Sequence, residues 1–160
     1  HAIIKSGLFM FAGAIIFTTG KTKVNELTGL GKRMPILYLC YTTIALGLIG
    51  IPPTSGVVSK WYLATGAYGS GIGVFSWLGP IVLLISALLT AVYLLEICVK
   101  AFFSVTDKVE TRKQESELCK INVSKLMLIP MIIYAALNVS LGIITSPLNS
   151  YLDKILNTLF

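Results

Sequence analysis

At residues 35–61 the chain reads PILYLCYTTIALGLIGIPPTSGVVSKW, and this stretch decides how the surrounding sequence folds. Between Pro35 and Trp77 the only charged residue is Lys60, eight positions after Pro52. Proline has no amide hydrogen and its ring clashes with the preceding helical turn, so a helix cannot run unbroken through Pro52 and Pro53. We therefore predict an apolar helix that is broken at the two prolines, with an ionisable amine just beyond the break. Such an arrangement suggests ion handling.

The composition is that of an integral membrane protein. Hydrophobic residues make up 55% and charged residues 12% of the 160 residues, and the mean hydropathy is +0.82. Four apolar stretches, about 2–19, 36–66, 77–103 and 123–146, each come close to the ~20 residues that cross a hydrocarbon core. Because backbone amides in lipid must be paired internally, these stretches are predicted to be helices. We expect an all-α membrane bundle of about four transmembrane helices, the second broken at Pro52–Pro53.

The basic residues gather on one side of this predicted bundle. Ten of the thirteen lie in or beside the connections that follow the first and third spans: Lys21, Lys23, Lys32, Arg33, Lys100, Lys108, Arg112, Lys113, Lys120 and Lys125. The positive-inside rule makes this side cytoplasmic in a cell membrane, which puts both ends of the chain outside. The net charge of +6 is then explained by topology, and no nucleic-acid partner is needed to account for it.

Both ends of the chain carry a further expectation. After Pro147 the apolar residues of the tail recur on one helical stripe. They are Tyr151, Leu152, Ile155, Leu156 and Leu159. This stripe predicts a C-terminal helix along the outer membrane interface. At the other end, His1 opens an apolar span directly and without a signal-peptide pattern, so we expect a fragment whose upstream residues are missing.

The cysteines do not have the spacing of metal ligands. Cys40 and Cys98 fall in apolar spans and Cys119 falls in the predicted cytoplasmic connection. This spacing argues against an iron–sulfur or zinc centre. We predict no metal site and no cofactor, and we find no pattern of catalytic chemistry in the chain.

Lys60 is the first candidate site residue. Thr54, Ser55 and Gly56 offer a cap and a flexible restart for a second half-helix, and carbonyls freed by the break can hold water or a cation. Desolvation penalises the charged form of a buried lysine, so such an amine can carry protons near neutral pH. The alternative is one long helix with a proline kink, from which Lys60 snorkels to the outer surface. Spacing alone leaves both open.

Three further ionisable side chains in or beside the spans are candidates for a proton relay. His1 and Lys5 lie four residues apart, on one face of the first helix, and facing lipid would be costly for either. Glu96 and Lys100 are also four apart, in the order that favours an ion pair, so Glu96 either pairs locally or takes part in the relay. Because Glu96 is the only carboxylate in the four spans, the composition favours protons over a sodium cage.

Several motifs together resemble a known family. They are HAIIKSGLF at residues 1–9, GLGKRMP at 29–35, GIPPTSG at 50–56, SKW at 59–61 and SALLTAVY at 86–93. In order and spacing they resemble the antiporter-like membrane subunits shared by respiratory complex I, membrane-bound hydrogenases and the multisubunit Mrp cation/proton antiporters. Beyond Phe103 the resemblance is only topological.

The resemblance implies both an architecture and residue roles. Members of that family are bundles of about fourteen helices with two inverted repeats, each containing a broken helix. Residues 1–160 would be the C-terminal part of one such domain. Lys60 would be the outlet lysine of a water-filled proton half-channel, and Lys5 and His1 the central relay that feeds it. Glu96 is the fourth candidate relay residue.

Three functions are compatible with this sequence. The segment around Lys60 looks most like the D-type subunit of Mrp antiporters, which implies proton translocation in a multisubunit monovalent cation/proton antiporter. The first alternative is a proton-pumping membrane subunit of NADH-quinone oxidoreductase or a membrane-bound hydrogenase, driven by redox chemistry in other chains. The second is a membrane scaffold that conducts nothing. The expected partners are other membrane subunits, the lipid bilayer, protons, and Na⁺ or K⁺.

Overall fold

The structure is a computed structural model that describes residues 1–71, 73–103, 123–145, 149–151, 154–155 and 158. Its helices are α1 (Ala2–Thr19), the 3₁₀ helix η1 (Val24–Leu27), α2 (Leu30–Arg33), α3 (Pro35–Ile49), α4 (Ser55–Gly69), α5 (Val74–Phe102) and α7 (Lys125–Ile143). No strand occurs among the described residues. The prediction of an all-α bundle is confirmed.

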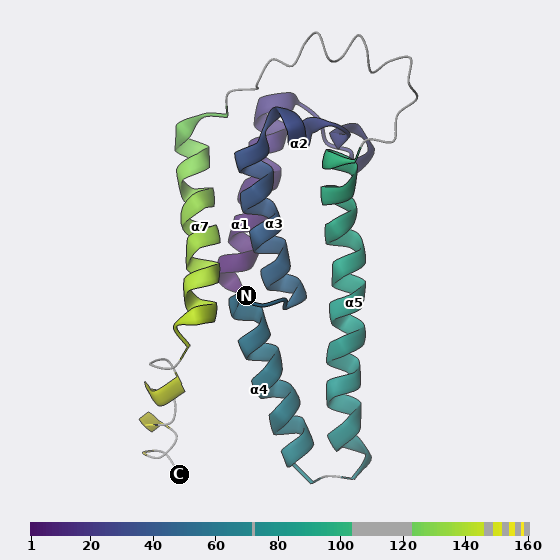
Figure 1. The fold of residues 1–160 in the computed structure, drawn as a ribbon, viewed down its shortest axis with the longest axis vertical. Coiled ribbons are helices and arrows are strands. Elements are labelled where there is room, and N and C mark those ends of the chain that lie inside the picture. The colour runs from purple at the N-terminus through teal and green to yellow at the C-terminus, as the bar shows by residue number, and fades with distance from the viewer. Residues whose placement is uncertain (72, 104–122, 146–148, 152–153, 156–157, 159–160) are drawn as a thin grey trace.

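The helices α3 and α4 are the two halves of one broken helix (Figure 1). α3 ends at Ile49, and Gly50 follows it with a φ of 88°, a left-handed conformation that favours glycine. α4 begins at Ser55 and continues away from α3 along the same side of the long helix α5. The break therefore falls at Pro52 and Pro53, as the sequence predicts.

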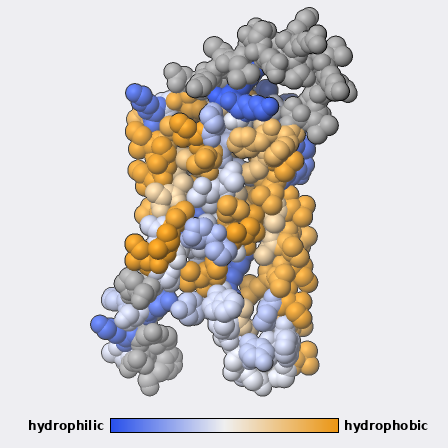
Figure 2. Space-filling view, in the orientation of Figure 1, coloured by the Kyte–Doolittle hydropathy of each residue, from blue (hydrophilic) through white to orange (hydrophobic). Residues whose placement is uncertain are grey.

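The helices have the lengths and apolarity of a multi-pass membrane protein. Among the described residues, α1, α5 and α7 are each long and apolar enough to cross a membrane, and α3 is a shorter apolar helix of 15 residues. Fifteen residues rise only ~22 Å, so α3 depends on α4 to complete a crossing of ~30 Å. Apolar side chains cover much of the outer surface, including the length of α5 (Figure 2).

The centre of the bundle is α3, which packs against α1, α4, α5 and α7. Its side chains Leu37 and Ile44 are 1% and 0% exposed. Phe11 of α1 stacks on Tyr41 with the ring centroids 4.2 Å apart, and it meets the ring of Tyr38 edge-on at 5.1 Å. This aromatic cluster joins α1 to the central helix, because offset and edge-on rings attract each other beyond simple burial.

Two tyrosines of α3 differ in their hydrogen bonding, so their replacement by phenylalanine is expected to affect stability differently. The Tyr41 hydroxyl donates to the carbonyl of Leu94 at 3.1 Å, whereas the buried Tyr38 hydroxyl has no partner among the residues that the structure describes. Tyr41→Phe is expected to lower the free energy of unfolding by about 1 kcal/mol. Tyr38→Phe is expected to leave it unchanged or raise it by up to about 1 kcal/mol, because an unpaired buried hydroxyl is removed. Parallel thermal unfolding of the two detergent-solubilised variants tests this pair, and equal losses would contradict it.

Six of the nine basic residues in the described part gather at one end of the bundle, where α1 and α5 end and α7 begins (Figure 1). They are Lys21, Lys23, Lys32, Arg33, Lys100 and Lys125. The other predicted cytoplasmic residues Lys108, Arg112, Lys113 and Lys120 lie outside the described residues. The cytoplasmic assignment of this end stays a prediction.

The tail after α7 is described in part. Residues 149–151, 154–155 and 158 are helical, and the Asn149 side chain reaches α4 through the hydroxyl of Tyr62. The rest of the predicted interfacial helix lies outside the described residues. Its place at a membrane interface stays a prediction.

Candidate functional site

Lys60 folds back from the second turn of α4 onto the last carbonyls of α3. Its Nζ donates to the carbonyl oxygens of Leu48 at 3.0 Å and of Ile49 at 2.6 Å. In an uninterrupted helix these carbonyls would accept from the amides four residues further on. Those amides belong to Pro52 and Pro53, which have no amide hydrogen. The two prolines therefore leave free the two acceptors that the lysine takes.

The surroundings of the Lys60 ammonium include a helix end and a glycine. It lies at the C-terminal end of α3, where the helix dipole is negative, and its side chain is half-buried. A Cβ on Gly50 would lie 2.9 Å from the Cδ of Lys60 and 3.3 Å from its Nζ, so the glycine leaves room for the amine. The ammonium points at the break, which differs from the alternative of a kinked helix with a snorkelling lysine.

Glycines allow the backbones around the break to approach closely. A Cβ on Gly56 would overlap the carbonyl oxygen of Gly47, and a Cβ on Gly142 of α7 would overlap the carbonyl oxygen of Pro53. The sequence suggests that Gly56 gives α4 a flexible restart, but in the structure its missing side chain lets α4 contact α3. The break is thus a tightly packed junction of α3, α4 and α7.

The predicted side-chain cap of α4 is wrong. Thr54 occupies the N-cap position, but no side chain caps the helix there. The Thr54 hydroxyl instead donates back to the carbonyl of Ile51 at 2.7 Å, and Ser55 donates to a side chain of α7. Both hydroxyls therefore hold the junction together rather than the first turn of α4.

Lys5 and His1 lie at the level of the break, at the start of α1. α1 runs antiparallel to α3, with contacts between Gly7 and Ile44, Phe11 and Tyr41, and Thr18 and Met34. Continued to the start of α1, this register puts His1 level with Gly50 and Lys5 about one turn away (Figure 1). Both side chains are exposed. No hydrogen bond or ion pair in the described part of the chain joins either of them to Lys60.

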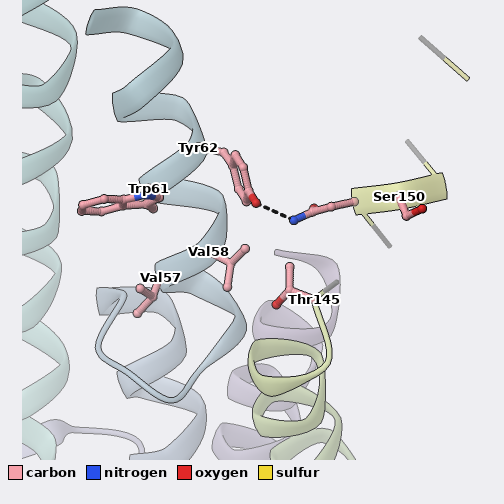
Figure 3. A pocket seen from close by; sticks show the side chains of 7 residues that line it. Val57, Val58, Trp61, Tyr62, Thr145 and Ser150 are labelled. Carbon is pink, nitrogen blue, oxygen red and sulfur yellow. Dashed lines mark hydrogen bonds between the residues drawn. The ribbon is translucent and has the colours of Figure 1, made fainter. Parts of the chain in front are cut away.

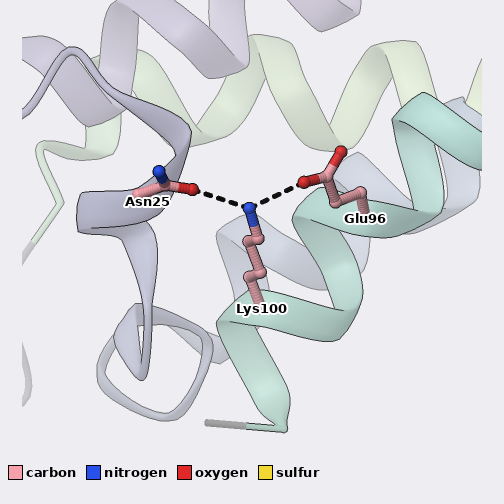
Figure 4. Close-up of polar contacts among 3 residues, drawn as sticks. All are labelled: Asn25, Glu96 and Lys100. Atoms are coloured by element: carbon pink, nitrogen blue, oxygen red, sulfur yellow. Dashed lines mark hydrogen bonds and ion pairs between the residues drawn. The ribbon is translucent and has the colours of Figure 1, made fainter. Parts of the chain in front are cut away.

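Glu96 pairs with Lys100 near the end of α5 (Figure 4). The Lys100 Nζ lies 2.6 Å from a Glu96 carboxylate oxygen and donates to the Asn25 side-chain oxygen at 2.7 Å. The predicted ion pair is therefore present, and the separate hydrogen bond from Lys100 to Asn25 ties α5 to η1. The structure does not bring Glu96 to Lys60, since antiparallel contacts such as Ala67 with Gly79 put Lys60 level with about residue 86 of α5. Ten helical residues, roughly 15 Å, then separate the two.

The ion pair leads to a prediction for Glu96. The carboxylate is half exposed, with a side-chain exposure of 51%, and pairs of this kind contribute at most about 1 kcal/mol. Glu96→Gln is therefore expected to cost less than about 1 kcal/mol of stability and to leave proton transport within about twofold of wild type. Thermal unfolding and proton flux of the same preparation check both values. A large loss of flux at unchanged stability would instead assign Glu96 to the relay.

The amino-acid sequence of this chain is similar to those of known proteins. Residues 1–90 match the family described as NADH:quinone oxidoreductase/Mrp antiporter, TM. The chain belongs to this family. The matched residues comprise α1, the whole junction from α3 to α4, and about the first half of α5, so Lys60, Lys5 and His1 all lie within the family region.

Individual relatives come from both branches of the family. The chain is 40% identical over 102 residues to NADH-quinone oxidoreductase subunit N of Desulforudis audaxviator, covering 64% of this chain and 20% of that protein. It is 34% identical over 157 residues to the D-type subunit of the Na(+)/H(+) antiporter of Bacillus subtilis, covering 98% of this chain and 30% of that protein. To F(420)H(2) dehydrogenase subunit N of Methanosarcina mazei it is 37% identical over 97 residues, covering 55% and 19%. The chain thus spans between about a fifth and a third of the length of these curated relatives.

The comparison corrects one expectation about this family. From the motifs, the resemblance beyond Phe103 is only topological. The similarity to the Bacillus subtilis antiporter protein covers 157 residues, or 98% of this chain, and so extends into α7.

Asn138 is a further polar residue of the junction, and it is not among the site residues predicted from the sequence. It is 0% exposed and lies on α7 against both α3 and α4. A signal for it is present, because Asn138 is the only side-chain amide in the apolar stretch 123–146. Polar side chains inside membrane helices usually face other protein groups.

A hollow of about 660 Å³ lies beside α4, on the side of the tail (Figure 3). Its lining residues are Val57, Val58, Trp61, Tyr62, Thr145, Asn149 and Ser150. The Asn149 Nδ2 donates to the Tyr62 hydroxyl at 2.7 Å across this hollow. Lys60 does not line it, so the hollow is separate from the carbonyls at the break.

The two described cysteines lie within the helix bundle, packed against neighbouring side chains. Cys40 is buried, and the Cys98 sulfur lies 3.4 Å from the Thr42 hydroxyl. Cys119 lies outside the described residues. Among the residues that the structure describes, no group of three His, Cys, Asp or Glu side chains is placed to hold a metal ion.

Proposed function

We propose that this chain forms the C-terminal part of the proton-conducting domain of a D-type subunit in a multisubunit monovalent cation/proton antiporter. The observation that carries the proposal is the Lys60 ammonium on the Leu48 and Ile49 carbonyls, at a break within a membrane helix. The similarity to a D-type antiporter subunit over 98% of this chain supports the antiporter class.

The geometry suggests how Lys60 carries a proton. The protonated amine donates to both carbonyls and is attracted by the negative end of α3. Release of the proton leaves a neutral amine, whose hydrogen bonds are about half as strong as those of the ammonium. Loading and release of one proton on Lys60 thereby change how firmly α4 is held to α3.

The remaining relay residues enter the proposal through their position. Lys5 and His1 lie on α1 at the level of the break, and we assign them the feeding of protons toward Lys60. A nearby positive charge disfavours protonation of Lys60, so loading of Lys5 would bias Lys60 toward release. Glu96 is the fourth candidate, and its ion pair with Lys100 is the competing role that the substitution above tests.

A redox-driven membrane subunit is the second candidate function. The 40% identity to a protein named NADH-quinone oxidoreductase subunit N favours it. The same lysine would then be loaded and emptied in response to electron transfer in other chains. This chain would contribute no catalytic chemistry of its own in either case.

The proposal includes a membrane placement and partners. We assign the basic end of the bundle to the cytoplasm and both ends of the chain to the outside of the cell membrane. The partners are other membrane subunits of the same assembly. The exchanged ions are protons and either Na⁺ or K⁺.

Everted membrane vesicles that contain the complete transporter test this function. Respiration acidifies the vesicle lumen, and a pH-sensitive dye reports the gradient. Addition of Na⁺ or K⁺ is expected to dissipate the gradient, whereas choline at the same concentration is expected to leave it intact. A respiratory gradient that the cations leave intact would contradict the antiporter function. In vesicles without other respiratory proton pumps, a gradient generated by an electron donor would favour the redox-driven subunit, and no gradient would favour the scaffold.

A further inference from the structure

A single side chain of α7 bridges the two halves of the broken helix. The Asn138 Nδ2 donates to the carbonyl of Thr43 in α3 at 2.9 Å, and its Oδ1 accepts from the hydroxyl of Ser55 in α4 at 2.8 Å. Asn138 is fully buried at 0% exposure. Since the two partners belong to different halves, this amide links α3 to α4 across the break.

The chemistry of the partners settles the orientation of the amide. The Thr43 carbonyl can only accept a hydrogen bond, so the NH₂ group of Asn138 must face it. The Oδ1 atom is then left for Ser55, whose hydroxyl donates. An apolar residue at position 138 would supply neither bond, although it would fill the same space.

Glycines leave the space that the Asn138 amide occupies. A Cβ on Gly47 would lie 2.5 Å from both the Nδ2 and the Oδ1 of Asn138. One turn further along α7, a Cβ on Gly142 would lie 2.8 Å from the Ser55 amide nitrogen. One face of α7 therefore contacts the end of α3 and the start of α4 at backbone distance, which small residues allow between membrane helices.

In each half of the broken helix, the residue that bonds to Asn138 precedes a residue of the lysine site by the same number of positions. Thr43 precedes Leu48 by five residues in α3, and Ser55 precedes Lys60 by five residues in α4. Because each half is a regular helix, the separation of Thr43 and Ser55 governs the separation of Lys60 from the Leu48 carbonyl. We propose that Asn138 is a positioning residue, which holds the two halves where Lys60 reaches its carbonyls. This inference rests on the proposed function, since it assigns a support to the proposed proton carrier.

Turnover per assembled complex separates positioning from simple packing. Asn138→Ala is expected to lower the kcat of cation-driven proton transport about tenfold, because the proton carrier loses its geometry. The KM for the cation is expected to stay within about twofold of wild type. Ser55→Ala removes one of the two bonds and is expected to lower kcat in the same direction. The double variant is expected to lose no more than Asn138→Ala alone, since both substitutions break one bridge.

Ser140→Ala is the matched control, because the one hydrogen bond of the Ser140 hydroxyl among the described residues goes to the Leu137 carbonyl of its own helix. It is expected to keep the wild-type kcat. A wild-type kcat per assembled complex in Asn138→Ala overturns the inference, as do independent, additive losses in the double variant. Where Asn138→Ala fails to assemble, the kcat of Ser55→Ala decides in its place.

Lys60→Ala measured in parallel keeps the two proposals apart. Inactive Lys60→Ala together with fully active Asn138→Ala refutes the positioning by Asn138 and leaves the proposed function standing. Active Lys60→Ala refutes the proposed function itself.

Discussion

Replacement of Lys60 by alanine is expected to lower cation-driven proton transport by about a hundredfold or more, while the amount of assembled transporter stays near that of wild type. A positioned group that takes and gives a proton contributes on this scale. The side chain is half-buried, and it bonds only to backbone carbonyls of the described chain. Its removal therefore takes away the proposed carrier without opening a large cavity. Dye-reported proton flux in vesicles, normalised to the assembled complex, measures the effect.

Lys60→Arg separates proton exchange from charge. Arginine keeps a cation for the Leu48 and Ile49 carbonyls, but it does not release its proton at any physiological pH. We expect Lys60→Arg to be as inactive as Lys60→Ala. An active arginine variant would show that Lys60 anchors the two half-helices only by its charge.

A control on the same helix is available for both Lys60 variants. Thr65 is exposed on α4, and within the part of the chain that the structure describes its hydroxyl bonds only to carbonyls of its own helix. Thr65→Ala is expected to transport at the wild-type rate. Wild-type flux in Lys60→Ala, with the control behaving normally, would favour a scaffold over a proton path.

The second large effect is expected from Gly56→Ala. The added methyl group would overlap the carbonyl oxygen of Gly47, which belongs to the backbone of α3 and cannot move aside as a flexible side chain would. Overpacking of this kind costs about 3 kcal/mol or more when the backbone itself must shift. We expect a strong loss of thermal stability in detergent and a low yield of assembled protein.

Gly66→Ala supplies the matched control on α4. No atom of the described residues lies within 4 Å of a Cβ at Gly66. Alanine there is expected to be neutral or to stabilise the protein by up to about 1 kcal/mol, because it restricts the unfolded chain and suits a helix. Equal thermal midpoints for the Gly56 and Gly66 variants would contradict the close packing of α4 on α3.

Much of the fold follows from local properties of the sequence. The long apolar stretches predict membrane helices because backbone amides in lipid have no other partners. Pro52 and Pro53 predict the break because each lacks an amide hydrogen, wherever the rest of the chain lies. The same fact identifies the Leu48 and Ile49 carbonyls as free acceptors. The motifs before and after the break are sufficient to indicate the family.

Only the tertiary structure decided which groups meet. Lys60 takes the freed carbonyls because the loop at the break turns α4 so that its second turn faces the end of α3. Asn138 reaches Thr43 and Ser55 from 95 and 83 residues away, and Glu96 shares Lys100 with Asn25 of a distant connection. These contacts depend on how separate helices pack, which the spacing along one helix cannot specify. The sequence by itself therefore determined the helices, the break and its free acceptors, and packing between helices determined their partners.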